Sequence, residues 1–346
     1  MKAFKWVALA IGVLLLLAAC GPKGPATVRL MSHDSFNVSE EVLAAFEEKN
    51  GITVEILPAG DTGTALNQAI LSKGDPIADV FFGVDNTFLS RALNEDIFSA
   101  YDSPLLDRIP DRFKLDPNNR LLPVDYGDVC PNYDKRWFEQ RNLAPPQSLE
   151  DLIKPEYKGL LVVQNPATSS PGLAFLLATI GHFGTDGYLD YWAALRANDV
   201  LVTDGWEQAY WGQFTAASDG DRPIVISYAS SPPAEVFFAD EELTEAPTAA
   251  IIADGSCFRQ IEFIGILRGS EQREAAEKLV DFMLSEQFQE DIPLQMFVFP
   301  TNENARLPEV FTRHTQIPDK PAEVDPAAIE AHREAWIEAW TDTVLR

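Results

Sequence analysis

The segment ADVFFGVD, residues 78–85, decides the fold of this chain. Its apolar run is typical of a strand that is buried on both faces of a parallel sheet. Upstream, a helix is predicted at TGTALNQAILSKG (62–74) and another strand at ITVEIL (52–57). Further upstream, NVSEEVLAAFEEKNG (37–51) predicts a helix, and TVRLMSHDSF (27–36) begins as a strand. Strands and helices alternating at this spacing indicate right-handed crossovers and a doubly wound α/β sheet.

Polar residues follow each of these three strands. They stand at residues 33–35 (His-Asp-Ser), 60–63 (Gly-Asp-Thr-Gly) and 85–86 (Asp-Asn). Ligands of open α/β sheets bind outside the carboxyl ends of the strands. We therefore expect a binding site in these loops, although Asp34 and Asp61 could each serve only as a turn or helix cap.

The rest of the chain predicts a second α/β lobe. A chain of 346 residues exceeds what one hydrophobic core usually supports. LLPVDYGDVCPNYDK (121–135) reads as an extended passage into the second lobe, and GSCFRQIEFIGIL (255–267) as the passage back. Two such crossings predict a hinge and a cleft, as in a binding protein that closes on its ligand. The boundaries we expect are 27–124 for the first part of lobe 1, 125–261 for lobe 2, and 262–346 for the return to lobe 1 with the C-terminal helices.

Within lobe 2 the chain predicts two strands with three helices between them. Beyond lobe 2, in the return to lobe 1, the C-terminal helix DPAAIEAHREAWIEAWTDTVL (325–345) carries Trp336 and Trp340 one turn apart, as expected of core aromatics. The lobe 2 elements are a strand at 159–166, helices at 169–184, 187–198 and 205–216, and a strand at 223–233.

The N-terminus reads as an export signal. Lys2 and Lys5 precede an apolar run, 7–17, that is too short for a comfortable membrane span. The four residues Leu-Ala-Ala-Cys at 17–20 resemble the lipobox of bacterial lipoproteins, in which the cysteine sulfur is lipidated. We therefore expect a signal peptide at 1–19, a lipidated Cys20 and a tether at 20–26, with the protein anchored to the outer face of the cell membrane, or in the periplasm of a double-membrane cell. The alternatives are an ordinary signal peptide with an incidental cysteine and an uncleaved helix.

Charge and cysteine content narrow the class of protein further. The formal net charge of −26 argues against nucleic acid as a partner, since phosphate binding requires clustered Lys and Arg. It is compatible with a cationic ligand, although acidic surfaces more often serve solubility. Two cysteines follow Cys20, and exported compartments tolerate disulfides. A Cys130–Cys257 bridge would stabilise the fold by about 4–5 kcal/mol in the chain-entropy model; the alternative is two buried free thiols.

Nine short segments, in one order from about Thr27 to the C-terminus, carry a family resemblance. The chain resembles the solute-binding component of bacterial ABC importers, with the type II periplasmic-binding-protein fold, and within it the thiamine-binding branch. The segments are DSF (34–36), ADVFFGVDN (78–86), DYG (125–127), PPQSLEDL (145–152), TSSPGLAFLL (168–177), VTDGWEQAY (202–210), SYASSP (227–232), QFQEDIP (287–293) and REAWIEAW (333–340).

The resemblance implies a protein without catalysis, cofactor or metal. It would capture thiamine, a thiamine phosphate or a pyrimidine precursor as a monomer, and deliver it to a permease and, through that, an ATPase. Thiamine has a cationic thiazolium ring and a flat aminopyrimidine. Its site therefore requires aromatic faces, each worth about 0.5–2 kcal/mol to the cation, together with a carboxylate.

The resemblance also implies which residues bind the ligand. Trp206 and Tyr228 match the family's aromatics, Asp61 its carboxylate and Ser169 its hydroxyl. The chain departs from the family at His33 and Phe297, and also at Ala234, where a family tyrosine is missing and Phe237 could fill the gap. The full predicted set is Asp61, Trp206, Tyr228, Ser169, Phe297, His33, Asp34, Asp125 and Tyr126. Packing is the alternative role for the aromatics and capping for Ser169; Glu262, facing either hinge or water, is not included.

The sequence leaves two alternatives to thiamine capture. The same fold could bind a polyamine through carboxylates and aromatics, or ferric iron, although iron-binding relatives use neighbouring tyrosines and ISYASSPP (226–233) offers only Tyr228. An extracellular hydrolase is the second alternative. The sequence contains no G-x-S-x-G elbow, no H-E-x-x-H motif and no Cys/His cluster at metal spacing.

Overall fold

The computed structural model describes residues 25–346 of the chain. The predicted signal peptide and Cys20 lie outside these residues, and Ala26, at the end of the predicted tether, already belongs to the first strand. The strands form one mixed sheet in the order β2-β1-β3-β10-β5-β8-β6-β7. Their bounds are β1 Ala26–Ser32, β2 Ile52–Pro58, β3 Val80–Asp85, β5 Leu122–Asp134, β6 Leu161–Gln164, β7 Leu201–Thr203, β8 Ile224–Tyr228 and β10 Phe258–Leu267, with β4 Phe98–Ser99, β9 Thr248–Ala250 and β11 Phe299–Pro300 paired beside this path.

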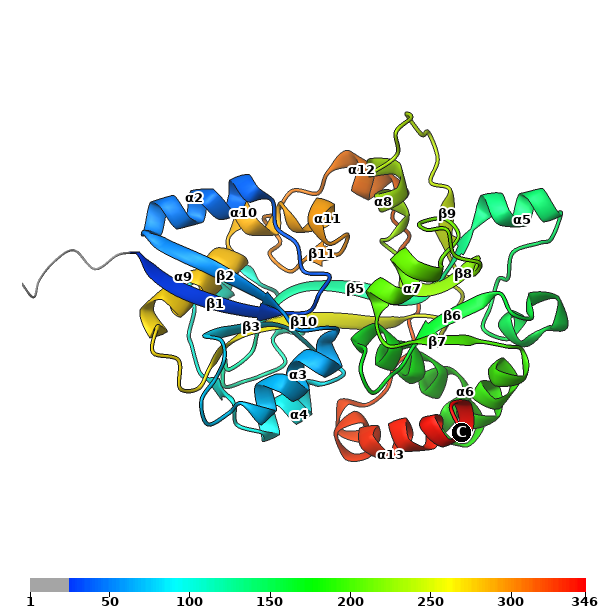
Figure 1. Cartoon of the computed structure of the whole chain (residues 1–346), viewed down its shortest axis with the longest axis horizontal. Helices are drawn as coiled ribbons and strands as arrows, with labels where there is room; N and C mark the ends of the chain where they lie inside the picture. Colours follow the sequence, from blue (N-terminus) through cyan, green and yellow to red (C-terminus); the bar gives the residue numbers. More distant parts are fainter. Residues whose placement is uncertain (1–24) are drawn as a thin grey trace, which may run out of the picture.

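Two long antiparallel strands connect the two halves of the molecule. β5 and β10 pair along the middle, with β1, β2 and β3 at one end and β6, β7 and β8 at the other (Figure 1). β1 pairs in parallel with β2 and β3, and β6 in parallel with β7 and β8. The predicted α/β class is therefore confirmed, and β5 and β10 are the two predicted extended crossings. The residue boundaries of the lobes stay a prediction.

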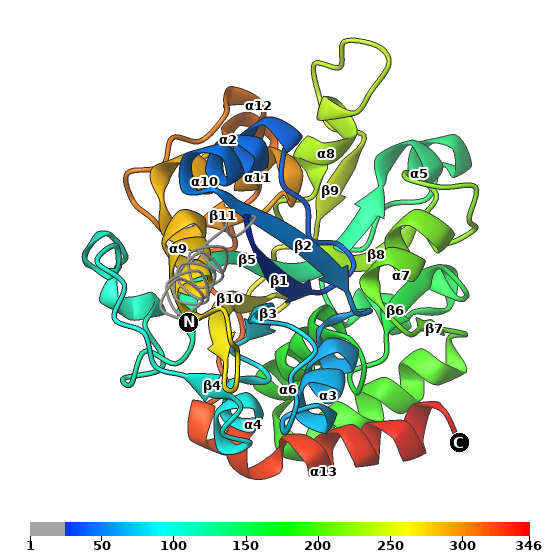
Figure 2. The same ribbon diagram turned by 60° about the vertical axis from the view of Figure 1, so that its left-hand side comes forward.

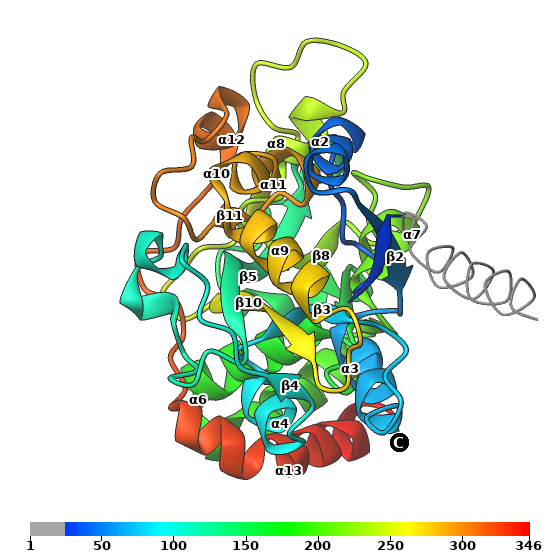
Figure 3. The same ribbon diagram turned by 90° about the vertical axis from the view of Figure 1, so that its left-hand side faces the viewer.

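The helices cover the faces of this sheet. α13 lies on the opposite side of the molecule from α12 in all three views, alongside α6 (Figures 1, 2 and 3). Their bounds are α2 Glu40–Asn50, α3 Thr62–Leu71, α4 Leu89–Asn94, α5 Lys135–Arg141, α6 Ser170–Ala197, α7 Trp206–Gln213, α8 Pro232–Phe237, α9 Arg273–Leu284, α10 Glu286–Gln289, α11 Ile292–Gln295, α12 Glu309–His314 and α13 Pro326–Val344. Within residues 25–346, no helix has the length and apolar character needed to cross a membrane.

Two helical predictions can be compared directly. Gly184 interrupts α6 with non-helical dihedrals, φ 74° and ψ 169°, at the point where two separate helices were predicted. Trp336 and Trp340 are buried, as predicted, and the Trp340 ring meets Trp192 of α6 edge-on with centroids 5.5 Å apart. α13 therefore closes the core on the side of α6.

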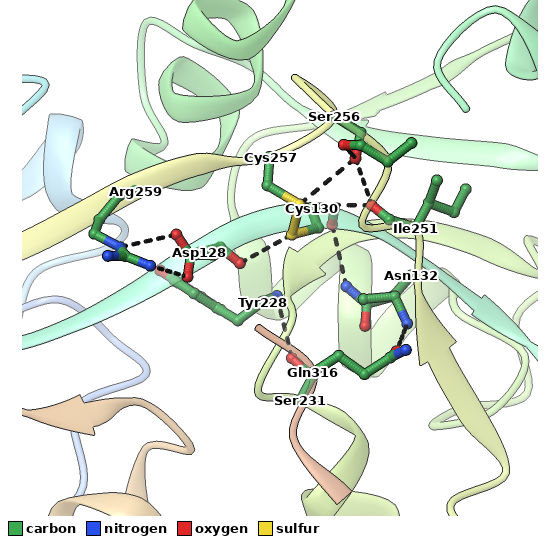
Figure 4. Close-up of a disulfide and its surroundings, with 12 residues drawn as sticks. Asp128, Cys130, Asn132, Tyr228, Ser231, Ile251, Ser256, Cys257, Arg259 and Gln316 are labelled. Atoms are coloured by element: carbon green, nitrogen blue, oxygen red, sulfur yellow. Dashed lines mark hydrogen bonds and ion pairs between the residues drawn. A yellow bond between two sulfur atoms is a disulfide. The ribbon is translucent and has the colours of Figure 1, made fainter. Parts of the chain in front are cut away.

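A disulfide joins the two central strands. The sulfurs of Cys130 on β5 and Cys257 just before β10 lie 2.11 Å apart. Beside them, Asp128 on β5 accepts two hydrogen bonds from the Arg259 guanidinium on β10, at 3.0 and 2.8 Å (Figure 4). Because the cysteines are 127 residues apart in the chain, this link constrains the two crossings where they meet lobe 2.

Candidate functional site

A cleft of about 360 Å³ opens where the loops after β1, β2 and β8 meet the starts of α3, α6 and α7. Six of the nine predicted ligand-binding residues line it: His33, Asp34, Asp61, Trp206, Tyr228 and Phe297. These residues are separated by up to 264 positions in the chain, yet they face one cavity. The expectation that the site lies outside the carboxyl ends of the strands agrees with this position.

The indole of Trp206 forms one aromatic wall of the cleft. Its ring stacks on Tyr210 with centroids 4.7 Å apart and an interplanar angle of 19°, and it meets Trp211 edge-on at 6.1 Å. The indole Nε1–H donates to Ser227 Oγ at 3.0 Å, which holds the ring in place. A ring fixed in this way presents its π-face without further loss of side-chain freedom.

Tyr228, at the end of β8, supplies a second ring. Its hydroxyl donates to Gln260 Oε1 at 2.9 Å. The ring packs against Gly127 on β5, where an added Cβ would stand 2.7 Å from Tyr228 Cδ1. Burial raises the pKa of the Tyr228 hydroxyl well above its usual value, and nearby carboxylates raise it further. The phenol therefore stays neutral and acts as a hydrogen-bonding wall.

Asp61 connects the starts of three helices. Its Oδ1 accepts from the backbone N–H of Thr62 at 2.7 Å and of Ser170 at 3.1 Å, and its Oδ2 accepts from the N–H of Trp206 at 3.0 Å. Burial raises the pKa of Asp61, while these amides oppose the rise. Asp61 is therefore both a helix cap and a cleft residue, and most of its acceptor capacity is already used within the protein.

Three predicted residues do not line the cleft. Ser169 is the N-cap of α6 and accepts from the Gly172 N–H at 3.3 Å; its neighbour Ser170 faces the cavity instead. Tyr126 stacks between two phenylalanines, with centroids 4.7 Å from Phe113 and 5.2 Å from Phe299. Asp125 is fully buried on β5. Because these three residues are absent from the lining of the cleft, the structure does not support their predicted contact with the ligand.

The cleft is acidic. Asp34, Asp61, Glu207 and Glu262 place four carboxyl groups along it, and its lining within the described residues contains no Lys or Arg. Burial raises the pKa of Glu207 to about 7, with help from the Asp34 carboxylate. The resulting field favours a cationic ligand.

His33 is the one basic group among the described residues of the lining, and it sits against a carboxylate. Its Nε2 lies 3.4 Å from Glu262 Oε1, and its Nδ1 is hydrogen-bonded to Ser35 Oγ at 2.9 Å. Burial alone would lower the pKa of His33, but Glu262 and the neighbouring aspartates raise it above its ordinary value. Gly83 on β3 makes room for the ring, because an added Cβ there would stand 2.5 Å from His33 Cδ2.

A third aromatic group lines the cleft near Ala234. Phe297 has a left-handed backbone, φ 54°, a strained conformation that is often found at binding sites. Phe238 lines the cleft with its ring centroid 5.6 Å from that of Phe297. Phe237, which we expected to fill the gap left at Ala234, lies 6.1 Å from Phe297 and is not part of the lining. Phe238 takes that position instead.

Comparison with known proteins identifies the family. The model of the bacterial extracellular solute-binding proteins matches residues 75–317. The chain belongs to this family. It is 31% identical over 341 residues to the thiamine-binding periplasmic protein of Escherichia coli strain K12, covering 96% of this chain and 98% of that one.

Solved structures share the fold of this chain. A periplasmic thiamin binding protein superposes with a TM-score of 0.83 at 29% identity, covering 94% of this chain and 98% of that chain. Iron-bound HitA from Pseudomonas aeruginosa superposes with a TM-score of 0.73 at 20% identity, covering 92% and 99%. The second likeness shows the fold alone. The chain thus has the predicted type II periplasmic-binding-protein fold.

Sequence reasoning missed several lining residues of this solute-binding protein. Glu207, Tyr210 and Trp211 follow Trp206 directly on α7, so the segment GWEQAYW (205–211) already contained the signal. Glu262 lies on the predicted return crossing, where the sequence leaves it facing either the hinge interior or water; the structure places it in the lining of the cleft.

Proposed function

We propose that this chain captures thiamine outside the cytoplasm and delivers it to an ABC permease. The observation that carries the proposal is the face of Trp206, fixed by Tyr210 and Ser227, beside a row of carboxyl groups with no Lys or Arg in the described lining. A thiazolium ring over that indole would gain about 0.5–2 kcal/mol from the cation–π contact. The carboxylates would add long-range attraction.

The charges of the cleft favour thiamine over its phosphates. A phosphate would require cationic side chains or free amides at helix starts. The amides that face the cavity at Thr62, Ser170 and Trp206 already bind Asp61. We therefore expect the unphosphorylated vitamin to bind most tightly.

Ferric iron fits the cleft less well than an organic cation. No group of three or more His, Cys, Asp or Glu side chains in residues 25–346 is placed to hold a metal ion. The hydroxyl of Tyr228 donates to Gln260, and that of Tyr210 donates to Glu235. A polyamine would use the same carboxyl groups, and it is the competing ligand that the test must separate.

The proposal includes the location and partners of the protein. A lipid on Cys20 would hold the monomer at the outer face of the membrane, next to the permease and its ATPase, and the protein would perform no chemical step and need no cofactor. Labelling of expressing cells with a radioactive fatty acid tests the anchor. We expect label in the wild-type chain and none in Cys20→Ser; equal labelling of both would contradict the anchor while leaving ligand capture intact.

Isothermal titration calorimetry tests the ligand. We expect sub-micromolar binding of thiamine, that is a binding free energy beyond about −8 kcal/mol, and weaker binding of thiamine phosphate, spermidine and Fe³⁺. Trp206→Ala should weaken thiamine at least tenfold. The matched control is Trp137→Ala, which removes an indole on α5 that does not line the cleft. Tighter binding of spermidine or Fe³⁺ than of thiamine, or equal losses in both variants, would contradict the proposal.

A further inference from the structure

Three carboxyl groups stand side by side across the central strands. In the register of the sheet, Glu262 on β10 lies opposite Asp85 on β3 and opposite Asp125 on β5. The register shifts immediately after Glu262 on the β5 side, and one residue later on the β3 side. Such bulges often turn a side chain toward a site. All three residues are buried, and Glu262 faces the cleft.

The three carboxyl groups differ in what they bind. Asp85 accepts from the Thr87 hydroxyl at 2.6 Å and from the Ser170 hydroxyl at 2.5 Å, so its oxygens are occupied. Neither oxygen of Asp125 has a hydrogen-bond partner among the described residues, and Glu262 lies opposite Asp125 in the strand register. Burial, followed by the Glu262 charge, raises the pKa of Asp125 well above its usual value. Asp125 and Glu262 therefore form a buried carboxyl pair that lies opposite in the strand register.

Glu262 is left with acceptor capacity that faces the ligand. Its Oε1 lies 3.4 Å from His33 Nε2, and its neighbour on β5 in the strand register is Asp125. Asp61, by contrast, spends its oxygens on three backbone amides. An occupant of the cleft that supplies an N–H at this point gains a hydrogen bond to a carboxylate, and an occupant without such a donor does not.

We propose that Glu262, backed by Asp125, is the specificity-determining acceptor for the amino group of a flat heteroaromatic ligand. The inference rests on the proposed function and assigns the thiamine aminopyrimidine to the part of the cleft beside Glu262. The exocyclic amine donates an N–H to the carboxylate. A 4-oxo group at the same place would point a lone pair at it, and two acceptors facing each other repel.

Titration of thiamine and of its 4-oxo analogue, oxythiamine, tests this assignment. We expect the wild-type protein to prefer thiamine by about 10- to 100-fold, the range for a hydrogen bond to a charged group. Glu262→Gln, whose amide can face either group, should bring the two affinities within about threefold of each other. Glu207→Gln is the matched control: it removes a carboxyl from the same cleft and should weaken both ligands while leaving their ratio unchanged.

A second variant guards against loss of folding. Glu262→Asp keeps the charge but withdraws the carboxylate by one methylene, and it should also lower the preference for thiamine. An unchanged preference in a folded Glu262 variant would overturn the inference while leaving the proposed function standing. Failure of the wild-type protein to bind either compound would overturn the proposed function and, with it, this inference.

Discussion

Asp61→Asn separates the structural role of this carboxylate from its charge. An asparagine retains one oxygen, which can keep the bonds to the Thr62 and Ser170 amides and then turns its NH₂ toward the N–H of Trp206. One charge-assisted hydrogen bond is lost, worth about 1.5–3 kcal/mol. Taking about 2 kcal/mol, and an unfolding entropy of about 2.1 cal/mol/K per residue, the melting temperature should fall by about 3 °C.

The assay is thermal unfolding followed by circular dichroism, paired with calorimetric titration of thiamine. Asp34→Asn is the matched control, because Asp34 is an exposed cleft carboxylate for which no side-chain hydrogen bond is recorded among the described residues. Both variants should bind the cation more weakly, but only Asp61→Asn should melt earlier. The reasoning is refuted if the two variants share one melting temperature, because the three-helix link would then contribute nothing to stability.

Three further outcomes follow from the geometry of the cleft. Because the pKa of Glu207 is raised to about 7, its carboxyl group is charged above that pH and neutral below it. The affinity for thiamine, measured by calorimetry, should therefore fall from pH 8 to pH 6. Glu207→Gln should flatten that pH dependence. Phe238→Ala should weaken thiamine binding about three- to tenfold, whereas Phe237→Ala should leave it unchanged; equal effects in fluorescence titrations would contradict the assigned wall. Gly83→Ala should lower the melting temperature and weaken thiamine binding, because the added Cβ would meet the His33 ring and because φ at this position is 108°. An unaltered melting temperature and affinity would show that the space beside His33 tolerates the methyl group.

Much of the fold could be predicted because it depends on sequence patterns among residues that are close together in the chain. The apolar run at 78–85 and the helix before it are recognisable from neighbours in the chain, as are the two extended crossings. The loops after these strands then had to lie at one edge of the sheet, which is why His33 and Asp61 were found. Trp206 came from the family resemblance, and its partners on α7 were within reach of the same helical spacing.

Patterns among residues close together in the chain therefore determined the order of strands and helices and the two crossings. The family resemblance supplied Trp206, Tyr228 and Phe297, whereas Tyr210, Trp211 and Phe238 were not predicted. Only the tertiary structure decided that Ser170 rather than Ser169 faces the cavity, and that Phe238 takes the position expected for Phe237. It also placed Glu262 beside Asp125, residues 137 positions apart, through a shift in strand register. Which side chain faces the cavity depends on how a helix is rotated, or a strand shifted in register, relative to elements that are distant in the chain. A one-residue shift of a strand moves a side chain to the other face of the sheet.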